Sequence, residues 1–318
     1  MEDDELKGSL MSIRTTVRKD GNIKYALSGD DAFVAAVDPG ETFKVECAIN
    51  VNDGTIRHVG QQLTEKDVTL PFVNGATGPI EVRGARPGDA LSVEILDFKP
   101  VGLGFTALWP GIGIFPDWVR NREFGIQTRV VEVSEDTVHW SDKVKLPFRP
   151  MVGVVGVAPT HGSVLTVDNG AHGGNLDVQE VKPGNITTLR VQKPGAHLFL
   201  GDCHAIQGDG EVNGMGAIEI AADLTVRVSL AQAPARMTWP RIETPTHIAT
   251  LGCARPLEDA MRIAFQEMVY WLEDDYGIPS AEAYMLLGQI AEARCTQAVN
   301  PKYTYICKVS KSILSDFG

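Results

Sequence analysis

The stretch that decides the fold reads Gly201-Asp202-Cys203-His204-Ala205-Ile206-Gln207-Gly208-Asp209-Gly210-Glu211-Val212. The apolar triplet before it, residues 198–200, is typical of a buried strand, and the segment after it, residues 218–230, is typical of a second strand. The glycines between them let the chain turn sharply. This stretch therefore predicts a strand, a turn and a returning strand within a β-rich protein.

The polar side chains of the first strand are expected on one face. Alternate residues of a strand share a face, so Asp202 and His204 should point the same way and Cys203 the other way. The turn should bring Asp209 and Glu211 to the same neighbourhood. Carboxylates grouped around an imidazole suit a divalent metal or general acid–base chemistry.

A second polar segment reads Ala171-His172-Gly173-Gly174-Asn175-Leu176-Asp177. His172 and Asp177 flank a Gly-Gly turn, which allows a close backbone approach to a ligand or to another strand. A histidine, an amide and a carboxylate so near one another can form half of a metal site. A functional interpretation of the two segments requires that they meet in space.

Structural alternatives remain open for these residues. Asp-Gly is the commonest hairpin turn, and a lone histidine in a β protein is more often a hydrogen-bonded structural residue. Cys203 as a nucleophile is disfavoured because its neighbour His204 should point away from it. The sequence contains no serine-elbow, Walker or dinucleotide-binding motif, and His58, His161 and Ser163 are weaker candidates.

Pro-Gly turns recur before segments with strand-like alternation. They read Asp38-Pro39-Gly40-Glu41, Arg86-Pro87-Gly88-Asp89 and Lys182-Pro183-Gly184-Asn185. Proline presets φ and glycine accepts a positive φ, so each predicts a tight turn that leads into a strand. Residues 102–117, rich in glycine, proline and aromatics, are predicted to be irregular, either as a loop over a site or as a crossover between sheets.

In the C-terminal part, the apolar residues recur at the spacing of a helix. Residues 257–276 predict a helix that ends at Gly277, and Ser280 is the expected N-cap of a second helix that runs to about Glu292. Residues 303–309 alternate again and predict a return to a sheet. These helices are expected to cover the sheets.

Together these signals predict a mainly β protein with an α+β C-terminal part, in which β-sandwich or barrel-like units are covered by two C-terminal helices. The predicted boundaries are an N-terminal tail at residues 1–20, a β-rich catalytic core at 21–250 and a helical cover with a returning strand at 251–318. Residues 21–150 and 151–250 are candidates for two β units within the core.

Composition limits the classes of partner. A net charge of −12 argues against nucleic acid and anionic membrane surfaces. The acidic N-terminus lacks the apolar region of a signal peptide, and the five scattered cysteines contain no Cys-x-x-Cys pair, which suits a reducing, cytoplasmic compartment. A homodimer or higher homo-oligomer is expected, with the apolar C-terminal helices and Trp271 as a candidate interface that packing within the chain explains equally well.

The sequence resembles the acetamidase/formamidase family. The resemblance covers nearly the whole chain, and its longest motifs are His-Gly-Gly-Asn-x-Asp at residues 172–177 and Gly-Asp-x-His-Ala-x-x-Gly-Asp-Gly-Glu at residues 201–211. Residues 78–89, 150–159, 281–287 and 298–301 also look similar. The chain departs from the family pattern at Cys47-Ala48-Ile49-Asn50, at Cys295-Thr296-Gln297 and in residues 160–170, and loops of this kind can line a substrate pocket.

The resemblance implies hydrolysis of a small carboxamide, such as formamide or acetamide, to the carboxylate and ammonia. The residue chemistry independently suggests a metal-activated water, because a divalent metal can polarise the amide carbonyl and lower the pKa of a bound water. The expected metal ligands are His172, Asp177, Asp202 and His204. Glu211 is the expected general base with Asp209 as its alternate, and Asn175 would contact the substrate or the oxyanion together with Gln207, Gly173 and Gly174. The mix of imidazole and carboxylate favours zinc, and calcium or manganese would also accept these ligands.

Two other functions remain open. One is a metal-dependent hydrolase or lyase acting on another small C–N substrate. The other is a non-catalytic β module that binds a metal or a small ligand, although such a module has no need for so many proton-transfer groups.

Overall fold

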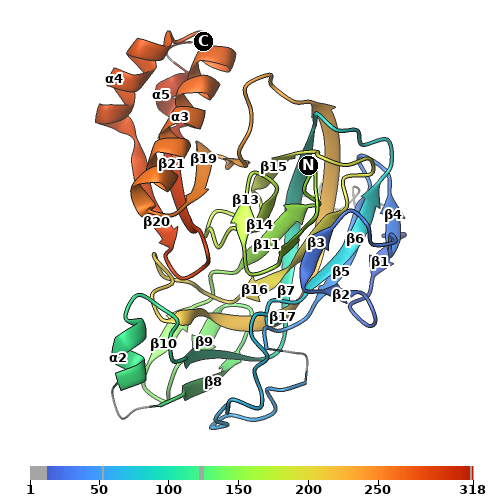
Figure 1. Cartoon of the computed structure of the whole chain (residues 1–318), viewed down its shortest axis with the longest axis vertical. Helices are drawn as coiled ribbons and strands as arrows, with labels where there is room; N and C mark the ends of the chain where they lie inside the picture. The colour runs from blue at the N-terminus through green and yellow to red at the C-terminus, as the bar shows by residue number, and fades with distance from the viewer. Residues whose placement is uncertain (1–12, 52–53, 122–124, 316, 318) are drawn as a thin grey trace, which may run out of the picture.

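The computed structural model describes residues 13–51, 54–121, 125–315 and 317 of the chain. Its main element is one strongly curved, 19-stranded sheet (Figure 1). Its strands are β1 (Thr16–Val17), β2 (Ile23–Lys24), β4 (Ala35–Val37), β5 (Thr42–Cys47), β6 (Ala76–Val82), β7 (Asp89–Leu108), β8 (Gln127–Val133), β9 (Thr137–His139), β10 (Lys145–Pro147), β11 (Met151–Val157), β13 (Asn169–Gly170), β14 (Gly173–Asn175), β15 (Ile186–Arg190), β16 (Leu198–His204), β17 (Gly214–Gln232), β18 (Arg241–Glu243), β19 (His247–Ala254), β20 (Glu292–Gln297) and β21 (Tyr303–Ser310). The strands β3 (Ala26–Ser28) and β12 (Ser163–Leu165) form a separate pair.

The helices of the described residues are few and mostly C-terminal. They are α2 (Pro116–Asn121), α3 (Leu257–Tyr276), α4 (Ser280–Ile290) and α5 (Lys311–Leu314). The helices α3 and α4 gather with β19–β21 at one end of the molecule, while α2 and β8–β10 lie at the other end (Figure 1). The predicted fold class, a β protein covered by two C-terminal helices, is confirmed. The boundaries at residues 20, 150 and 250 stay predictions.

The three Pro-Gly turns form as predicted. In each, the residue after the glycine donates its N–H to the carbonyl of the residue before the proline. The glycines Gly40, Gly88 and Gly184 have φ of 87°, 98° and 85°. These are the dihedrals of a type II turn, in which a side chain at the third position would be strained. The turns lead into β5, β7 and β15.

The prediction of an irregular segment at residues 102–117 was wrong for its first part. Residues 102–108 belong to β7, which pairs with β17 along most of its length. Gly104 allows this close packing, since a Cβ there would lie 2.7 Å from Ile218 Cγ2. The glycines of residues 102–108 therefore made a strand look like an irregular segment in the sequence. Residues 109–115 are irregular, and α2 follows them.

The C-terminal predictions are confirmed except at the second helix. Helix α3 ends at Gly277, whose φ is 65°. Helix α4 begins at Ser280 with Pro279 as its N-cap, so Ser280 is not the cap; its hydroxyl donates to Glu273 at 2.7 Å. Helix α4 ends at Ile290, and Glu292 begins the unpredicted strand β20.

Helix α3 packs directly on β19 and β21 around an apolar cluster that includes Trp271. Trp271 is 5% exposed, so packing within the chain accounts for it. Among the described residues, none of the helices combines the length and the apolar character that crossing a membrane requires.

We expect Gly252→Ala to destabilise the protein, because the added methyl group would lie 2.0 Å from the carbonyl oxygen of Ala260 in α3. The expected loss in free energy of unfolding is about 1–3 kcal/mol, as for overpacking in a core. Gly288→Ala, where no atom lies within 4 Å, is the control and should stabilise α4 by about 0.5–1 kcal/mol. Chemical denaturation measures both, and equal effects of the two variants would contradict the packing argument.

Candidate active site

A buried centre of one imidazole and four carboxylates lies beside the point where β16 meets β17. Strand β16 carries Asp202 and His204, and His204 pairs in register with Glu219 of β17. Glu211 belongs to the turn between these strands, and Asp177 follows β14. All five side chains lie in residues that are at most 5% exposed.

The imidazole lies between two carboxylates. His204 Nε2 is 3.5 Å from Asp202 Oδ2 and 3.3 Å from Glu219 Oε2. The ligand atoms of Asp177, Asp202 and His204 all lie within 4.8 Å of one another, and those of His204, Glu211 and Glu219 do the same. Asp202 and His204 therefore point the same way, as strand alternation predicts.

Gln207 fixes which nitrogen of His204 carries a hydrogen. Gln207 Nε2 donates to the backbone carbonyls of Asp177 (3.0 Å) and Thr296 (3.1 Å), so its Oε1 faces His204 Nδ1 at 2.9 Å. Since a carbonyl oxygen only accepts, Nδ1 carries the hydrogen and the lone pair of a neutral imidazole lies on Nε2. That lone pair faces carboxylates, an arrangement that only a proton or a cation at Nε2 makes favourable.

Several acceptor atoms of the centre have no hydrogen-bond partner among the described residues. They are Asp177 Oδ1, His204 Nε2, Glu211 Oε2 and Glu219 Oε2. Buried polar atoms are nearly always paired, so these converging lone pairs need an electrophilic partner. Carboxylate oxygens and an imidazole nitrogen are ordinary ligands of divalent cations, so the donor set fits a metal site.

The pKa values of the centre shift in the direction that negative crowding requires. Burial, reinforced by Asp202, raises the pKa of Asp177 to about 7. Burial, with Asp177 next, raises the pKa of Glu211 well above its usual value. Burial, with Glu219 next, also raises the pKa of Asp202. Burial alone would lower the pKa of His204, but the Glu219 and Asp202 carboxylates raise it well above 6.5. The centre therefore favours uptake of positive charge.

The backbone around the centre is strained. Three of its carboxylate residues, Asp177, Asp202 and Glu211, have φ of 47°, 53° and 46°. Non-glycine residues rarely adopt this left-handed region, and such strain gathers at functional sites. The surrounding sheet thus holds three acidic side chains in positions that the local sequence does not favour.

Gly153 of β11 leaves the space that two of the carboxylates occupy. A Cβ at this position would lie 2.4 Å from Asp177 Oδ1 and 2.5 Å from Asp202 Oδ2. Amide side chains hold the other oxygens: Asn300 Nδ2 donates to Asp177 Oδ2 at 2.6 Å, and Asn50 Nδ2 donates to Asp202 Oδ1 at 3.4 Å. Both carboxylates are therefore fixed by neutral neighbours.

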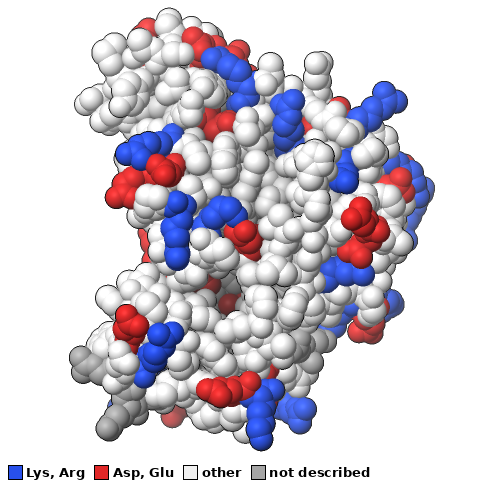
Figure 2. Space-filling view, viewed as in Figure 1, with Lys and Arg blue, Asp and Glu red and all other residues white. Residues whose placement is uncertain are grey.

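A cavity of about 530 Å³ opens next to the centre. Glu211 and Glu219 line it together with Asn50, Asn74, Asn175 and Asn300, and the irregular residues 111–114 contribute to its wall. The space-filling view shows a hollow in this face of the molecule with acidic atoms visible inside it (Figure 2). The loop predicted either to cover a site or to cross between sheets thus lines this cavity at residues 111–114.

The structure brings together Asp177, Asp202, His204 and Glu211, so the two polar segments do meet. It does not bring His172 or Asp209 to them. His172 is buried near Lys302 and Asp168, and Asp209 has a 62% exposed side chain that pairs with Arg294.

The remaining candidates have different positions. Asn175 lines the cavity, and its Oδ1 has no hydrogen-bond partner among the described residues. Gln207 lies behind His204. Gly173 and Gly174 let β14 approach other strands, since a Cβ would lie 2.2 Å from Val155 O or 2.5 Å from Asp168 O. Burial, with Cys47 beside it, raises the pKa of Cys203 well above its usual value, so Cys203 is a poor nucleophile.

Sequence reasoning missed Glu219, Asn50 and Asn300 as parts of the centre. Glu219 could have been found from the sequence, because it is the one charged residue in the apolar run of residues 217–222. A charge buried within a strand needs a partner. Asn50 and Asn300 were noted only in the comparison with the family pattern. No local feature connects them to carboxylates so distant in sequence.

Comparisons with known proteins give one consistent result. The sequence model of the Acetamidase/Formamidase family matches residues 19–166 and 161–313. The structure is similar to an acetamidase from Bacillus halodurans, with 31% identity, a TM-score of 0.88 and coverage of 95% of this chain and 99% of that one. It is also similar to an acetamidase from Yersinia enterocolitica, with 32% identity, a TM-score of 0.87 and coverage of 98% and 99%.

Curated relatives match over a shorter part. A formamidase from Methylophilus methylotrophus is 27% identical over 67% of this chain and 65% of its own length. The chain spans about 62% to 65% of the length of the curated relatives that it matches.

We expect Gly153→Ala to weaken binding of a divalent cation, because the methyl group would displace the carboxylates of Asp177 and Asp202. The affinity for Zn²⁺ or Mn²⁺, measured by isothermal titration calorimetry, should fall by about 10–100-fold, as when the support of metal ligands is lost. Gly208→Ala, which has nothing within 4 Å, should bind as the wild type does. Unchanged affinity in a folded Gly153→Ala variant would exclude these two carboxylates as ligands.

His172 should make stability depend on pH. Burial, followed by the charge of Lys302, lowers its pKa from 6.5 to about 4, so the unfolded chain binds the proton more readily. Stability is then lost as the pH falls from about 6.5 towards 4, by about 1.5 kcal/mol between pH 6.5 and 5. Urea unfolding of the wild type and His172→Gln at both pH values measures this. The free energy of unfolding of His172→Gln should fall less between the two pH values than that of the wild type. An equal fall in both proteins would show that His172 is not buried as a neutral ring.

Proposed function

This chain belongs to the acetamidase/formamidase family, and we propose that it hydrolyses a small linear carboxamide, of the formamide or acetamide class, to the carboxylate and ammonia. The observation that carries the proposal is the buried centre of His204 and four carboxylates, two of which, Glu211 and Glu219, line a cavity together with four asparagines. The chemistry of an unreactive amide bond requires both charge stabilisation and proton transfer, and this centre has groups for each.

The residues that would hold a divalent cation are Asp177, Asp202, His204 and Glu219. The unpartnered atoms of Asp177, His204 and Glu219 support this choice, as do the position of Asp202 Oδ2 at 3.5 Å from His204 Nε2 and the orientation of His204 by Gln207. A cation held there would polarise the amide carbonyl and lower the pKa of a water molecule. The mixed imidazole and carboxylate set is compatible with zinc, and manganese would accept it too.

Glu211 is the best-placed general base. It lines the cavity, and its Oε2 has no hydrogen-bond partner among the described residues. Its raised pKa, which burial and the neighbouring Asp177 produce, suits a carboxylate that takes a proton from water and later donates it to the leaving nitrogen. Asp209, its predicted alternate, has no such position.

The unpaired acceptor of Asn175 explains why this site would select amides as substrates. An amide substrate brings an NH₂ group with two donors, and Asn175 Oδ1 is an unpaired acceptor in the cavity wall. A site with a buried acceptor discriminates against analogues that cannot donate to it. We therefore propose that Asn175 orients the carboxamide and favours it over the corresponding ester.

The proposal is tested by ammonia release from formamide, acetamide and longer amides, before and after chelation with verified metal removal. We expect turnover to stop on chelation and to return with one divalent metal. Glu211→Gln should keep the metal and lower kcat by about 10²–10⁴-fold, the usual contribution of a general base. Glu219→Gln, a matched change in the same centre, should lose metal affinity instead.

Each part can fail separately. If none of the amides releases ammonia, the proposed activity is excluded. Full activity after verified removal of metal would exclude the cation. If Glu211→Gln loses the metal, Glu211 is a ligand and the base lies elsewhere.

A further inference from the structure

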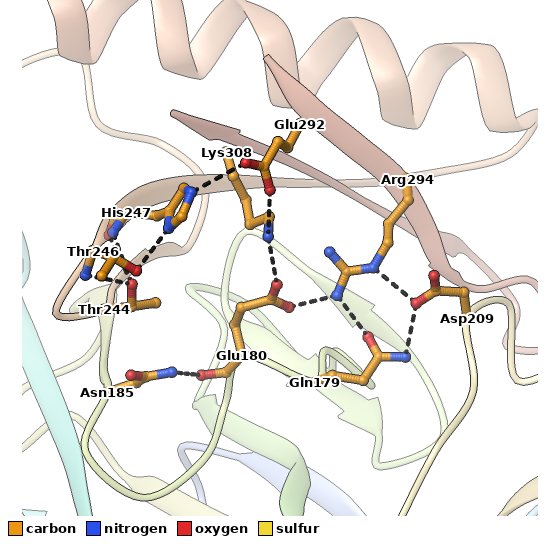
Figure 3. A network of polar contacts seen from close by, with 10 residues as sticks. All are labelled: Gln179, Glu180, Asn185, Asp209, Thr244, Thr246, His247, Glu292, Arg294 and Lys308. Carbon is orange, nitrogen blue, oxygen red and sulfur yellow. Dashed lines mark hydrogen bonds and ion pairs between the residues drawn. The ribbon is translucent and has the colours of Figure 1, made fainter. Parts of the chain in front are cut away.

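A polar network joins the C-terminal hairpin β20–β21 to two loops of the core (Figure 3). Arg294 of β20 is at its centre. Arg294 Nε donates to Asp209 Oδ1 at 2.8 Å, and one terminal nitrogen donates to Glu180 Oε2 at 2.8 Å and to Gln179 Oε1 at 3.1 Å. Gln179 Nε2 also donates to Asp209 Oδ1 at 3.3 Å, which closes the ring of contacts.

Each segment that Arg294 joins carries a group of the buried centre two residues away. Asp209 lies two residues before Glu211, and Gln179 lies two residues after Asp177. Arg294 itself lies two residues before Thr296, whose carbonyl accepts from Gln207 and so helps to orient His204. One guanidinium thus connects three segments that position the base, a ligand and the imidazole.

The backbone extends the same connection. Gly210 N–H donates to Thr296 O at 3.0 Å, and Ala298 N–H donates to Gly210 O at 2.9 Å. The hairpin therefore pairs with the turn directly before Glu211. Because Glu211 has a positive φ of 46°, this turn needs support from its surroundings to keep that conformation.

We propose that Arg294 is a positioning residue for the reaction: it holds the turn that carries Glu211 and the segment that carries Asp177, and it contacts neither of these side chains. The role rests on the proposed amide hydrolysis. Arginine suits it because the planar guanidinium donates in two directions at once, to Asp209 on one side and to Glu180 with Gln179 on the other.

The environment of Arg294 supports a functional connection more than a surface ion pair. The side chain is 25% exposed and that of Glu180 is 12% exposed, so the pair is only partly screened by water. Lys308 belongs to the same network and contacts Glu180 at 3.3 Å and Glu292 at 3.1 Å. It has no contact with Asp209 among the interactions of the described residues, so it provides a matched control.

The test compares Arg294→Ala, Arg294→Lys, Asp209→Asn, the double variant Arg294→Ala with Asp209→Asn, and the control Lys308→Ala. For each variant kcat and KM are measured separately, together with thermal stability and hydrogen exchange of residues 207–214. We expect kcat of Arg294→Ala to fall by about 10²-fold, the effect of a misplacement near 1 Å, while KM changes less than about threefold. Lys308→Ala should keep kcat within about twofold of the wild type.

The remaining variants separate anchoring from catalysis. Asp209→Asn should lower kcat less than Arg294→Ala, and the double variant should be no worse than Arg294→Ala alone, because both changes break one connection. Arg294→Lys should recover part of the lost kcat. Exchange of residues 207–214 should rise in Arg294→Ala and stay as in the wild type in Lys308→Ala.

Three results would overturn the proposal. They are an unchanged kcat in Arg294→Ala, an equal loss in Lys308→Ala, and a loss of kcat without faster exchange in residues 207–214. A double variant far worse than Arg294→Ala would make Asp209 catalytic in its own right. If the wild type hydrolyses none of the amides, the proposed function fails, and hydrogen exchange alone then decides whether Arg294 anchors the turn.

Discussion

The rest of the structure depends on the burial of four carboxylates around one imidazole. Ionised carboxylates are costly to remove from water, and several close together repel one another, so such a centre persists only where positive charge compensates it. Several features of the fold accommodate this centre. Position 153 is a glycine, which leaves room for two of the carboxylates, and Asp177, Asp202 and Glu211 have a left-handed backbone conformation. The pairing of β16 with β17 then fixes His204 opposite Glu219.

In this centre the strands carry the proposed ligands His204 and Glu219, and a turn carries the proposed base. The paired strands β16 and β17 give rigid positions to His204 and Glu219, where a metal ligand needs constant geometry. Glu211, the proposed base, lies in a turn, and the turn is held from outside by the hairpin β20–β21. The C-terminal part is therefore more than a cover for the sheets, because it supplies contacts to the turn and, through Asn300, to Asp177.

The sequence predicted what local rules control. The Pro-Gly turns and helix α3 follow from the preferences of proline and glycine and from helical spacing, and Asp202 and His204 share a side by alternation. The turn brings Glu211 to the centre but leaves Asp209 at the surface, because Gly210 and Glu211 are both left-handed and separate the two side chains. Contacts between residues distant in sequence keep His172 away from the centre and place Asn50 and Asn300 beside it. No local sequence pattern predicts such contacts.

The neighbours of the centre show why its charge is left for a bound cation to balance. Asn50, Asn300 and Gln207 are neutral amides, and each makes a hydrogen bond to the centre without adding charge. In the described parts of the chain, none of the ion pairs joins a lysine or an arginine to any of the four carboxylates. A cationic side chain at such a position would neutralise a carboxylate and remove a ligand. The ion pairs of Arg294 end at Asp209 and Glu180, so this arginine orders segments around the centre without pairing with its carboxylates.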